Sequence, residues 1–152
     1  MIPLGLSRIL TTDFEALYAY KCGEYQRCLQ LSTHNVLTLI ADSAVNLPCL
    51  VPYPEFIQLL DDDIVSLIGL MSIVDASFRD TPMRAYVRQL YLSLYLMTQC
   101  QMKLRHSVTS LAQTLHYVGV ARRGLDKDFR VDQLLLKLTE RKIRLCIIRE
   151  LA

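Results

Sequence analysis

Three consecutive aspartates, Asp61–Asp63, form the sharpest charged cluster in the sequence. Hard divalent cations prefer clustered carboxylates, so a metal or phosphate-transfer site is one interpretation. Aspartate is also a preferred residue at helix N-termini, where its carboxylate meets the positive end of the helix dipole. No acidic residue or histidine recurs at a fixed spacing to complete a metal shell. We therefore predict that the cluster caps a helix and that the chain binds no metal.

Three histidines are the candidate general bases: His34, His106 and His116. A catalytic base of this kind needs a serine or cysteine nucleophile within hydrogen-bonding distance. Ser107 follows His106 directly, but adjacent side chains on a helix point in different directions. The sequence contains no GxSxG or HExxH motif and no phosphate-binding glycine loop, and it has only five glycines. We therefore predict that the chain is not an enzyme, with no catalytic residue and no cofactor.

Basic side chains recur at helical spacing near the end of the sequence, at Lys137, Arg141 and Arg144. Such a row can bind the phosphates of nucleic acid or an anionic membrane surface. It can equally be a solvated outer face, because Glu140 precedes Arg144 by four residues, the spacing of a helical ion pair. No aromatic residue interleaves the row, and the net charge is only +2, so nucleic-acid binding has little further support. These three residues are the candidate anion-binding site.

The cysteines are odd in number and widely spaced, with no CxxC pair. They are Cys22, Cys28, Cys49, Cys100 and Cys146. This pattern fits reduced, mostly buried side chains in a cytoplasmic protein. Residues 1–8 lack the charged start and the long apolar centre of a signal peptide. The apolar stretches are interrupted, as at Ser66 and Ser72, whereas a membrane-spanning helix needs about 20 apolar residues. We expect a cytoplasmic protein with no transmembrane segment.

Apolar residues at helical spacing predict an all-α fold, with almost none of the alternation that is typical of strands. The six expected helices cover about residues 12–21, 24–41, 61–78, 81–105, 107–123 and, after Asp126 or Asp128, up to 151. Short connections predict antiparallel hairpins within a single domain, 1–152. The last expected helix runs almost to the end of the sequence, so we expect this domain to be excised from a longer protein. Residues 42–54 combine prolines with apolar residues and are expected to form a strap along the core.

Apolar residues make up 52% of the sequence, more than in a typical soluble domain. We infer that another chain covers some of this apolar surface, although a tightly layered bundle would also absorb it. Helix 81–105 is apolar around most of its circumference, which predicts a central position, with its tyrosines in the core or on a partner surface. In the last helix, the positions expected to face the bundle are Val131, Leu134, Leu135, Leu138, Leu145, Cys146 and Ile148.

The stretch Ala16–Leu29 resembles the first two-thirds of a tetratricopeptide repeat. Gly23 occupies the turn between the two helices, where a glycine permits the backbone conformation that the turn requires. Tyr25 follows at the position of the tyrosine that wedges between the helices, and Cys28 replaces the small residue that lets them approach closely.

The sequence departs from that family in several places. The family's early Trp, Gly and Tyr positions fall on Thr12, Ala16 and Ala19, and its closing proline is missing. One degenerate copy covers residues 12–41, and no second copy follows at a period of 34 residues. The resemblance implies a peptide-binding groove lined by Asp13, Leu17, Tyr20 and Lys21. The alternative is a single hairpin without a groove, whose residues pack on the next helix or meet solvent.

A weaker resemblance concerns Tyr91–Cys100 and Thr109–Leu115. This block looks like the helical regions that follow nucleotidyltransferase-like domains in the cyclic-dinucleotide-synthase (male-abnormal) superfamily of marine invertebrates. The resemblance implies a regulatory or assembly module of an innate-immune protein, with the catalytic domain elsewhere.

The sequence as a whole predicts a protein–protein interaction or self-assembly module of a larger protein. Such a module would bind a protein or peptide partner, or a second copy of itself, by burying an apolar helical face. The alternative is a basic module that binds nucleic acid or an anionic membrane through the last helix. The first function predicts association that tolerates salt, and the second predicts binding that salt weakens strongly.

Overall fold

The computed structural model describes residues 15–41, 48–49, 62, 64–66, 87–125 and 130–151. The described helices are residues 15–21, α2 (Tyr25–Ala41), α6 (Gln89–Lys103), α7 (Val108–Arg123) and α8 (Arg130–Leu151). Two strands of two residues each, β1 (Pro48–Cys49) and β2 (Val87–Arg88), pair in antiparallel fashion. The predicted all-α fold is therefore confirmed.

Two of the predicted helices match the structure almost residue for residue: 24–41 corresponds to α2, and 107–123 to α7. Ser107 is the N-cap of α7, as its sequence position indicated, and its hydroxyl accepts a hydrogen bond from the backbone nitrogen of Ser110. Asp62 and residues 64–66 are helical, but Asp61 and Asp63 lie outside the described residues, so the cap prediction for this cluster stays a prediction. All of the strap except 48–49 also lies outside them.

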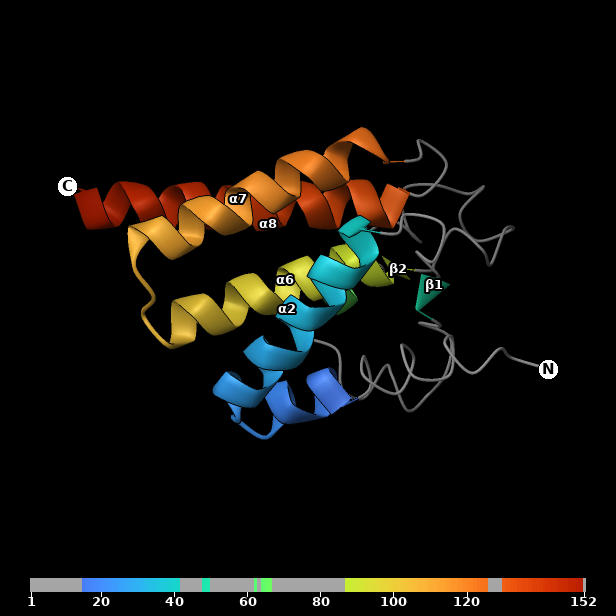
Figure 1. Ribbon diagram of the computed structural model, residues 1–152, viewed down its shortest axis with the longest axis horizontal. Coiled ribbons are helices and arrows are strands. Elements are labelled where there is room, and N and C mark those ends of the chain that lie inside the picture. Colours follow the sequence, from blue (N-terminus) through green and yellow to red (C-terminus); the bar gives the residue numbers. More distant parts are fainter. Residues whose placement is uncertain are drawn as a thin grey trace.

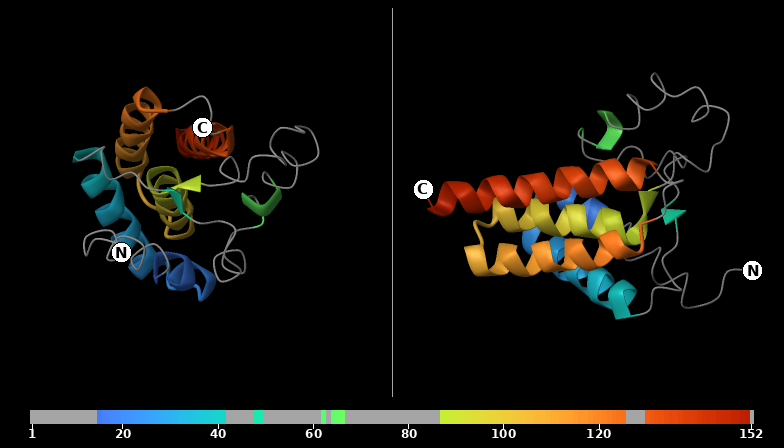
Figure 2. Two further views of the ribbon diagram at one scale, coloured as in Figure 1. Left: turned by 90° about the vertical axis from the view of Figure 1, so that its right-hand side faces the viewer. Right: turned by 90° about the horizontal axis from the view of Figure 1, so that it is seen from above.

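Helix α6 occupies the centre of the described helices, with α2 on one side and α7 and α8 on another (Figures 1 and 2). Every residue from Gln89 to Gln101 is buried, which confirms the central position expected for this helix. The tyrosines of α6 belong to the core. Tyr91 donates a hydrogen bond to the carbonyl oxygen of Ala121 in α7, and the Lys142 ammonium of α8 lies 5.9 Å from the ring centroid of Tyr95.

The start of the central helix corrects the sequence prediction. A continuous helix over 81–105 is wrong at residues 87 and 88, which are extended and pair with β1. The α6 helix begins only after Arg88, whose ψ angle is 151°. The backbone nitrogen of Arg88 donates to Oδ1 of Asp132, and its Nε donates to Oδ2, both at 2.9 Å. A carboxylate from α8 thus satisfies the amide that a longer helix would have used internally.

Removal of Asp132 should destabilise the domain, because its side chain is fully buried and the Arg88 guanidinium would lose this carboxylate. Removing one partner of a buried pair typically costs about 3–5 kcal/mol. We expect Asp132→Ala to lower the free energy of unfolding by that amount in urea titrations, and Glu150→Ala on the exposed end of α8 to change it by less than about 0.5 kcal/mol. Equal stability of the two variants would contradict a structural role for the pair.

The helix of residues 15–21 and α6 end in the same backbone geometry, with a different residue type at the left-handed position. After residues 15–21, Glu24 N donates to Ala19 O and Gly23 N to Tyr20 O, with Gly23 at φ 80°. This is the Schellman arrangement, in which one residue adopts the left-handed conformation. After α6 the same two bonds run from His106 to Gln101 and from Arg105 to Met102, and Arg105 takes φ 54°. Gly23 therefore occupies the turn that the repeat resemblance assigned to it.

Substitutions at these two turns should have opposite effects. A Cβ at a left-handed position costs about 1–2 kcal/mol, so we expect Gly23→Ala to destabilise the domain. Arg105→Gly removes such a Cβ and should stabilise it by less than about 1 kcal/mol, because glycine also gains freedom in the unfolded chain. Gly119→Ala within α7 is the matched control: its Cβ would meet no atom within 4 Å, and it should stabilise the helix. Thermal unfolding that ranks Gly23→Ala with Gly119→Ala would refute this account.

Candidate interaction surface on α8

The three basic residues singled out in the sequence lie together on the exposed side of α8. Lys137, Arg141 and Arg144 are all exposed, and their spacing of four and three residues places them on one face of the helix. Glu140 lies at the edge of this row. It binds Arg122 of α7 through Oε2, and its Oε1 accepts from Nε and Nη2 of Arg144 at 3.0 Å. The predicted ion pair between Glu140 and Arg144 is therefore confirmed.

The end of α8 carries exposed apolar side chains. Leu145, Ile148 and Leu151 are 45%, 61% and 74% exposed. For Leu145 and Ile148 this corrects the expectation that they face the bundle. Ile143 is fully buried there instead, while Cys146 and Ile147 pack partly against the core. Sequence spacing missed this, because apolar residues lie on both sides of the last turns and periodicity alone does not say which side has a neighbour.

The length of α8 carries its last turns beyond the other described helices that pack against it. It has 22 residues, whereas α6 has 15 and α7 has 16. At about 1.5 Å per residue, α8 is roughly 10 Å longer than α6. Figure 2 shows its C-terminal turns extending past the ends of both neighbouring helices. We call the combined set the α8 outward face. It consists of Lys137, Arg141, Arg144, Leu145, Ile148 and Leu151.

This face is distinct from the other exposed apolar positions. Within the part of the chain that the structure describes, the remaining large exposed apolar residues are Tyr18, Leu37 and Val65, each on a different helical segment. Single exposed apolar residues are normal on a protein surface, whereas a row at helical spacing is more informative. Among the described helices, α8 alone carries three such side chains in one row.

Of the four residues that the repeat resemblance placed along a peptide groove, two are packed against the core. Leu17 is fully buried and belongs to the core. Tyr20 is half-buried. Its ring packs edge-on against the ring of Tyr25, with 5.7 Å between the ring centroids, and its hydroxyl accepts a hydrogen bond from Nε2 of Gln99. Lys21 is exposed, and Asp13 lies outside the described residues. Leu17 and Tyr20 are therefore packing residues that fix the hairpin on α6.

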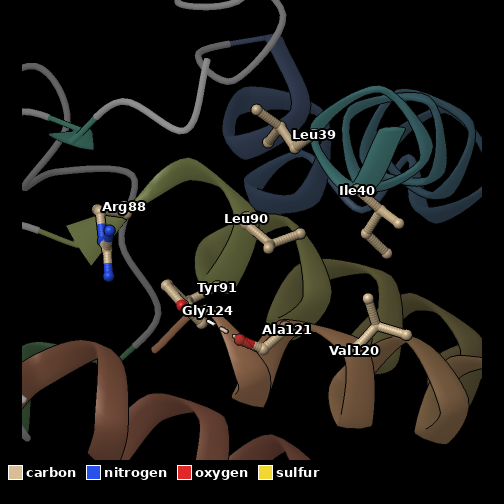
Figure 3. Close-up of a pocket in the computed structure, with 8 residues that line it drawn as sticks. All are labelled: Leu39, Ile40, Arg88, Leu90, Tyr91, Val120, Ala121 and Gly124. Atoms are coloured by element: carbon tan, nitrogen blue, oxygen red, sulfur yellow. Dashed lines mark hydrogen bonds between the residues drawn. The ribbon is translucent and has the colours of Figure 1, made fainter. Parts of the chain in front are cut away.

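Two of the hollows among the described helices are lined in part by α2. A pocket of about 190 Å³ lies between the end of α2, the start of α6 and the end of α7; Figure 3 shows Arg88 at one end of it and Ile40 and Val120 at the other. A shallower groove of about 460 Å³ runs between α2 and α7, over Met97 and Gln101. The first pocket is lined mainly by apolar side chains, and its one cation, Arg88, is already paired with Asp132.

The three histidines that could act as general bases come from three different elements. His34 lies on α2, His106 in the turn after α6 and His116 on α7. In the described ranges, no three His, Cys, Asp or Glu residues are arranged to hold a metal ion. No helix in these ranges is both long and apolar enough to cross a membrane.

Comparison with models of protein families, with curated proteins and with solved structures gives no match for this chain. The resemblances to a tetratricopeptide repeat and to the cyclic-dinucleotide-synthase superfamily therefore stay predictions. The surface chemistry of α8 is the basis on which a function can be argued.

Proposed function

We propose that this domain is a protein-interaction module whose α8 outward face binds an acidic, amphipathic helix of a partner protein. The observation that supports the proposal is the exposed row of Leu145, Ile148 and Leu151, which continues directly from the basic row of the same helix. Helical partners commonly dock through apolar anchors at this spacing. The basic row then selects the charge of the partner.

Neither the apolar row nor the basic row of the α8 outward face is sufficient by itself for stable binding. Full burial of a leucine or isoleucine side chain contributes about 1.5–3 kcal/mol, and these three are only partly exposed to begin with. Association costs at least about 4 kcal/mol in lost translational and rotational freedom. The basic residues must therefore meet opposite charge on the partner, because like charge across an interface is unfavourable and opposite charge speeds association and fixes the register.

The positive charge of the α8 outward face also favours a foreign partner over self-assembly. If two copies of the chain made contact through their α8 outward faces, Arg141 and Arg144 of one copy would approach the arginines of the other copy. These are Arg141, Arg144 and Arg149. We therefore expect the purified chain to stay monomeric in light scattering across protein concentration, at low and at high salt.

The proposal can be tested with synthetic helical peptides of three heptads. One peptide carries leucine at the core positions and glutamate at the flanking ones, and the matched peptide carries lysine in place of glutamate. We expect the acidic peptide to bind at least about tenfold more tightly in calorimetry, the effect of 1.4 kcal/mol. Ile148→Glu should abolish binding, and Leu37→Glu, at a 48% exposed leucine of α2, should leave it unchanged.

Equal binding of the two peptides, or equal loss of binding in the two variants, would rule out the α8 outward face as the binding surface. Circular dichroism of both variants checks that the helices are intact. Both substitutions replace an exposed apolar residue on a helix, so a change common to the two would report on stability and not on recognition.

A second candidate function, binding to an anionic membrane surface, is favoured by the order of residues along α8. The apolar residues lie at the tip and the basic residues behind them, so a tilted α8 would place Ile148 and Leu151 in the acyl boundary and Arg141 and Arg144 among the headgroups. Each such cation contributes about 1 kcal/mol at an anionic surface.

Vesicle sedimentation separates this function from the first. If the membrane is the ligand, the chain should sediment with vesicles that contain phosphatidylserine and not with phosphatidylcholine alone. Arg141→Glu and Ile148→Glu should each prevent sedimentation with these vesicles. Raising the salt concentration should weaken the binding, because dissolved ions screen the attraction between surface charges. Failure to sediment with either vesicle excludes membrane binding and leaves the acidic helix as the ligand.

A further inference from the structure

The groove between α2 and α7 has a polar lining that the proposed function does not use. Its volume is about 460 Å³, and side chains of α6 form its floor. Ligand sites in proteins usually have volumes of about 300–1,000 Å³, so the groove is large enough for a small molecule. None of its lining residues lies on α8, which makes it a site separate from the α8 outward face.

One wall of the groove is a row of hydrogen-bonding side chains on α7. Ser110, Gln113 and Tyr117 follow one another at intervals of three and four residues, which places them on one face of the helix. His106 continues this row in the turn before α7, and Thr33 of α2 lies on the opposite wall. The amide of Gln113 and the hydroxyls of Thr33 and Tyr117 make no hydrogen bond to any described residue.

The floor of the groove holds a buried amide with a free end. The Gln101 side chain belongs to a residue that is only 4% exposed, and its Oε1 accepts a hydrogen bond from the hydroxyl of Thr114 at 2.7 Å. This bond fixes the orientation of the amide. Its Nε2 makes no hydrogen bond to a described residue, and Gln101 lines the groove. The groove therefore presents an oriented N–H donor at its floor, where little water competes for it.

The chemistry of the lining defines the class of ligand. The described residues that line the groove include no Asp, Glu, Lys or Arg, so a charged ligand would lose hydration there without gaining an ion pair. Hydroxyl and amide side chains both donate and accept, so the ligand must offer donors and acceptors in return. The apolar side chains of Leu29 and Met97 line the same groove, so part of the ligand must also be apolar.

We propose that this groove binds a neutral saccharide that carries acetamido groups. The carbonyl oxygen of an acetamido group accepts the hydrogen bond from Nε2 of Gln101, and its methyl group packs on Met97 and Leu29. The hydroxyls of the sugar rings pair with Gln113 and Thr33 on the two walls. Each unpartnered polar group of the groove thereby meets a complementary group, and no charge is buried.

Titration followed by two-dimensional NMR of the isotope-labelled chain tests this proposal. The probe is triacetylchitotriose, and the matched control is cellotriose, which has the same rings and linkages with a hydroxyl in place of each acetamido group. We expect triacetylchitotriose to shift the backbone amide signals of Thr33, Gln101 and Gln113 and to leave that of Ile148 on α8 unchanged. Cellotriose should bind at least about tenfold more weakly, the effect of 1.4 kcal/mol.

Two substitutions should weaken the binding of triacetylchitotriose. Gln101→Met removes the donor at the floor and should raise the Kd at least about tenfold, whereas Gln113→Ala should raise it about three- to tenfold, the range expected for one hydrogen bond. Gln30→Ala is the matched control, because Gln30 is also exposed on a helix but does not line the groove, and it should leave the Kd unchanged. Since Gln113 is exposed, its replacement tests the groove even if Gln101→Met disturbs the core.

Several outcomes would overturn the proposal. One is the absence of shifts with triacetylchitotriose, and another is equal affinity for cellotriose. Equal loss of binding in Gln113→Ala and Gln30→Ala would exclude the groove as the site. Equal binding of N-acetyl-trialanine amide, which carries amides but no hydroxyls, would identify a peptide ligand instead of a saccharide. The acidic peptide reports on α8 and these probes report on the groove, so failure of one proposal leaves the other intact.

Discussion

The near-complete burial of α6 is the constraint on which the arrangement of the described helices depends. A helix that is buried on every side needs neighbours on every side, and α2, α7 and α8 supply them (Figure 2). Polar side chains inside such a helix need partners too. Gln101 accepts a hydrogen bond from Thr114 of α7, and Gln99 donates to Tyr20 of the first hairpin. These bonds fix which face of α6 meets which neighbour, a choice that apolar packing alone leaves open.

The same constraint produces the surface on which the proposed function rests. Helix α8 is anchored beside the start of α6 by the Asp132–Arg88 pair, and it runs past the end of α6. Its buried side follows the core down to Ile143, but its outward side beyond that point has no neighbour among the described helices. The exposed apolar tip is thus a consequence of unequal helix lengths around a central helix. In the proposed function, these additional turns of α8 bind the partner helix.

The core and the surface place different demands on cysteine and arginine. Cys28 of α2 and Cys100 of α6 are fully buried and belong to the core. Arg88 satisfies a buried carboxylate, whereas Arg141 and Arg144 remain at the surface, where they can meet a ligand.

The sequence by itself determined the helical class, the bounds of α2 and α7, the central place of α6 and the basic row on the last helix. These features follow from local periodicity, capping residues and spacing, which act over one or two turns. Only the tertiary structure decided that α6 begins after Arg88, that Leu17 is in the core and that Ile148 is exposed. Each of these depends on a residue distant in sequence, and no local pattern encodes which helix will be the neighbour.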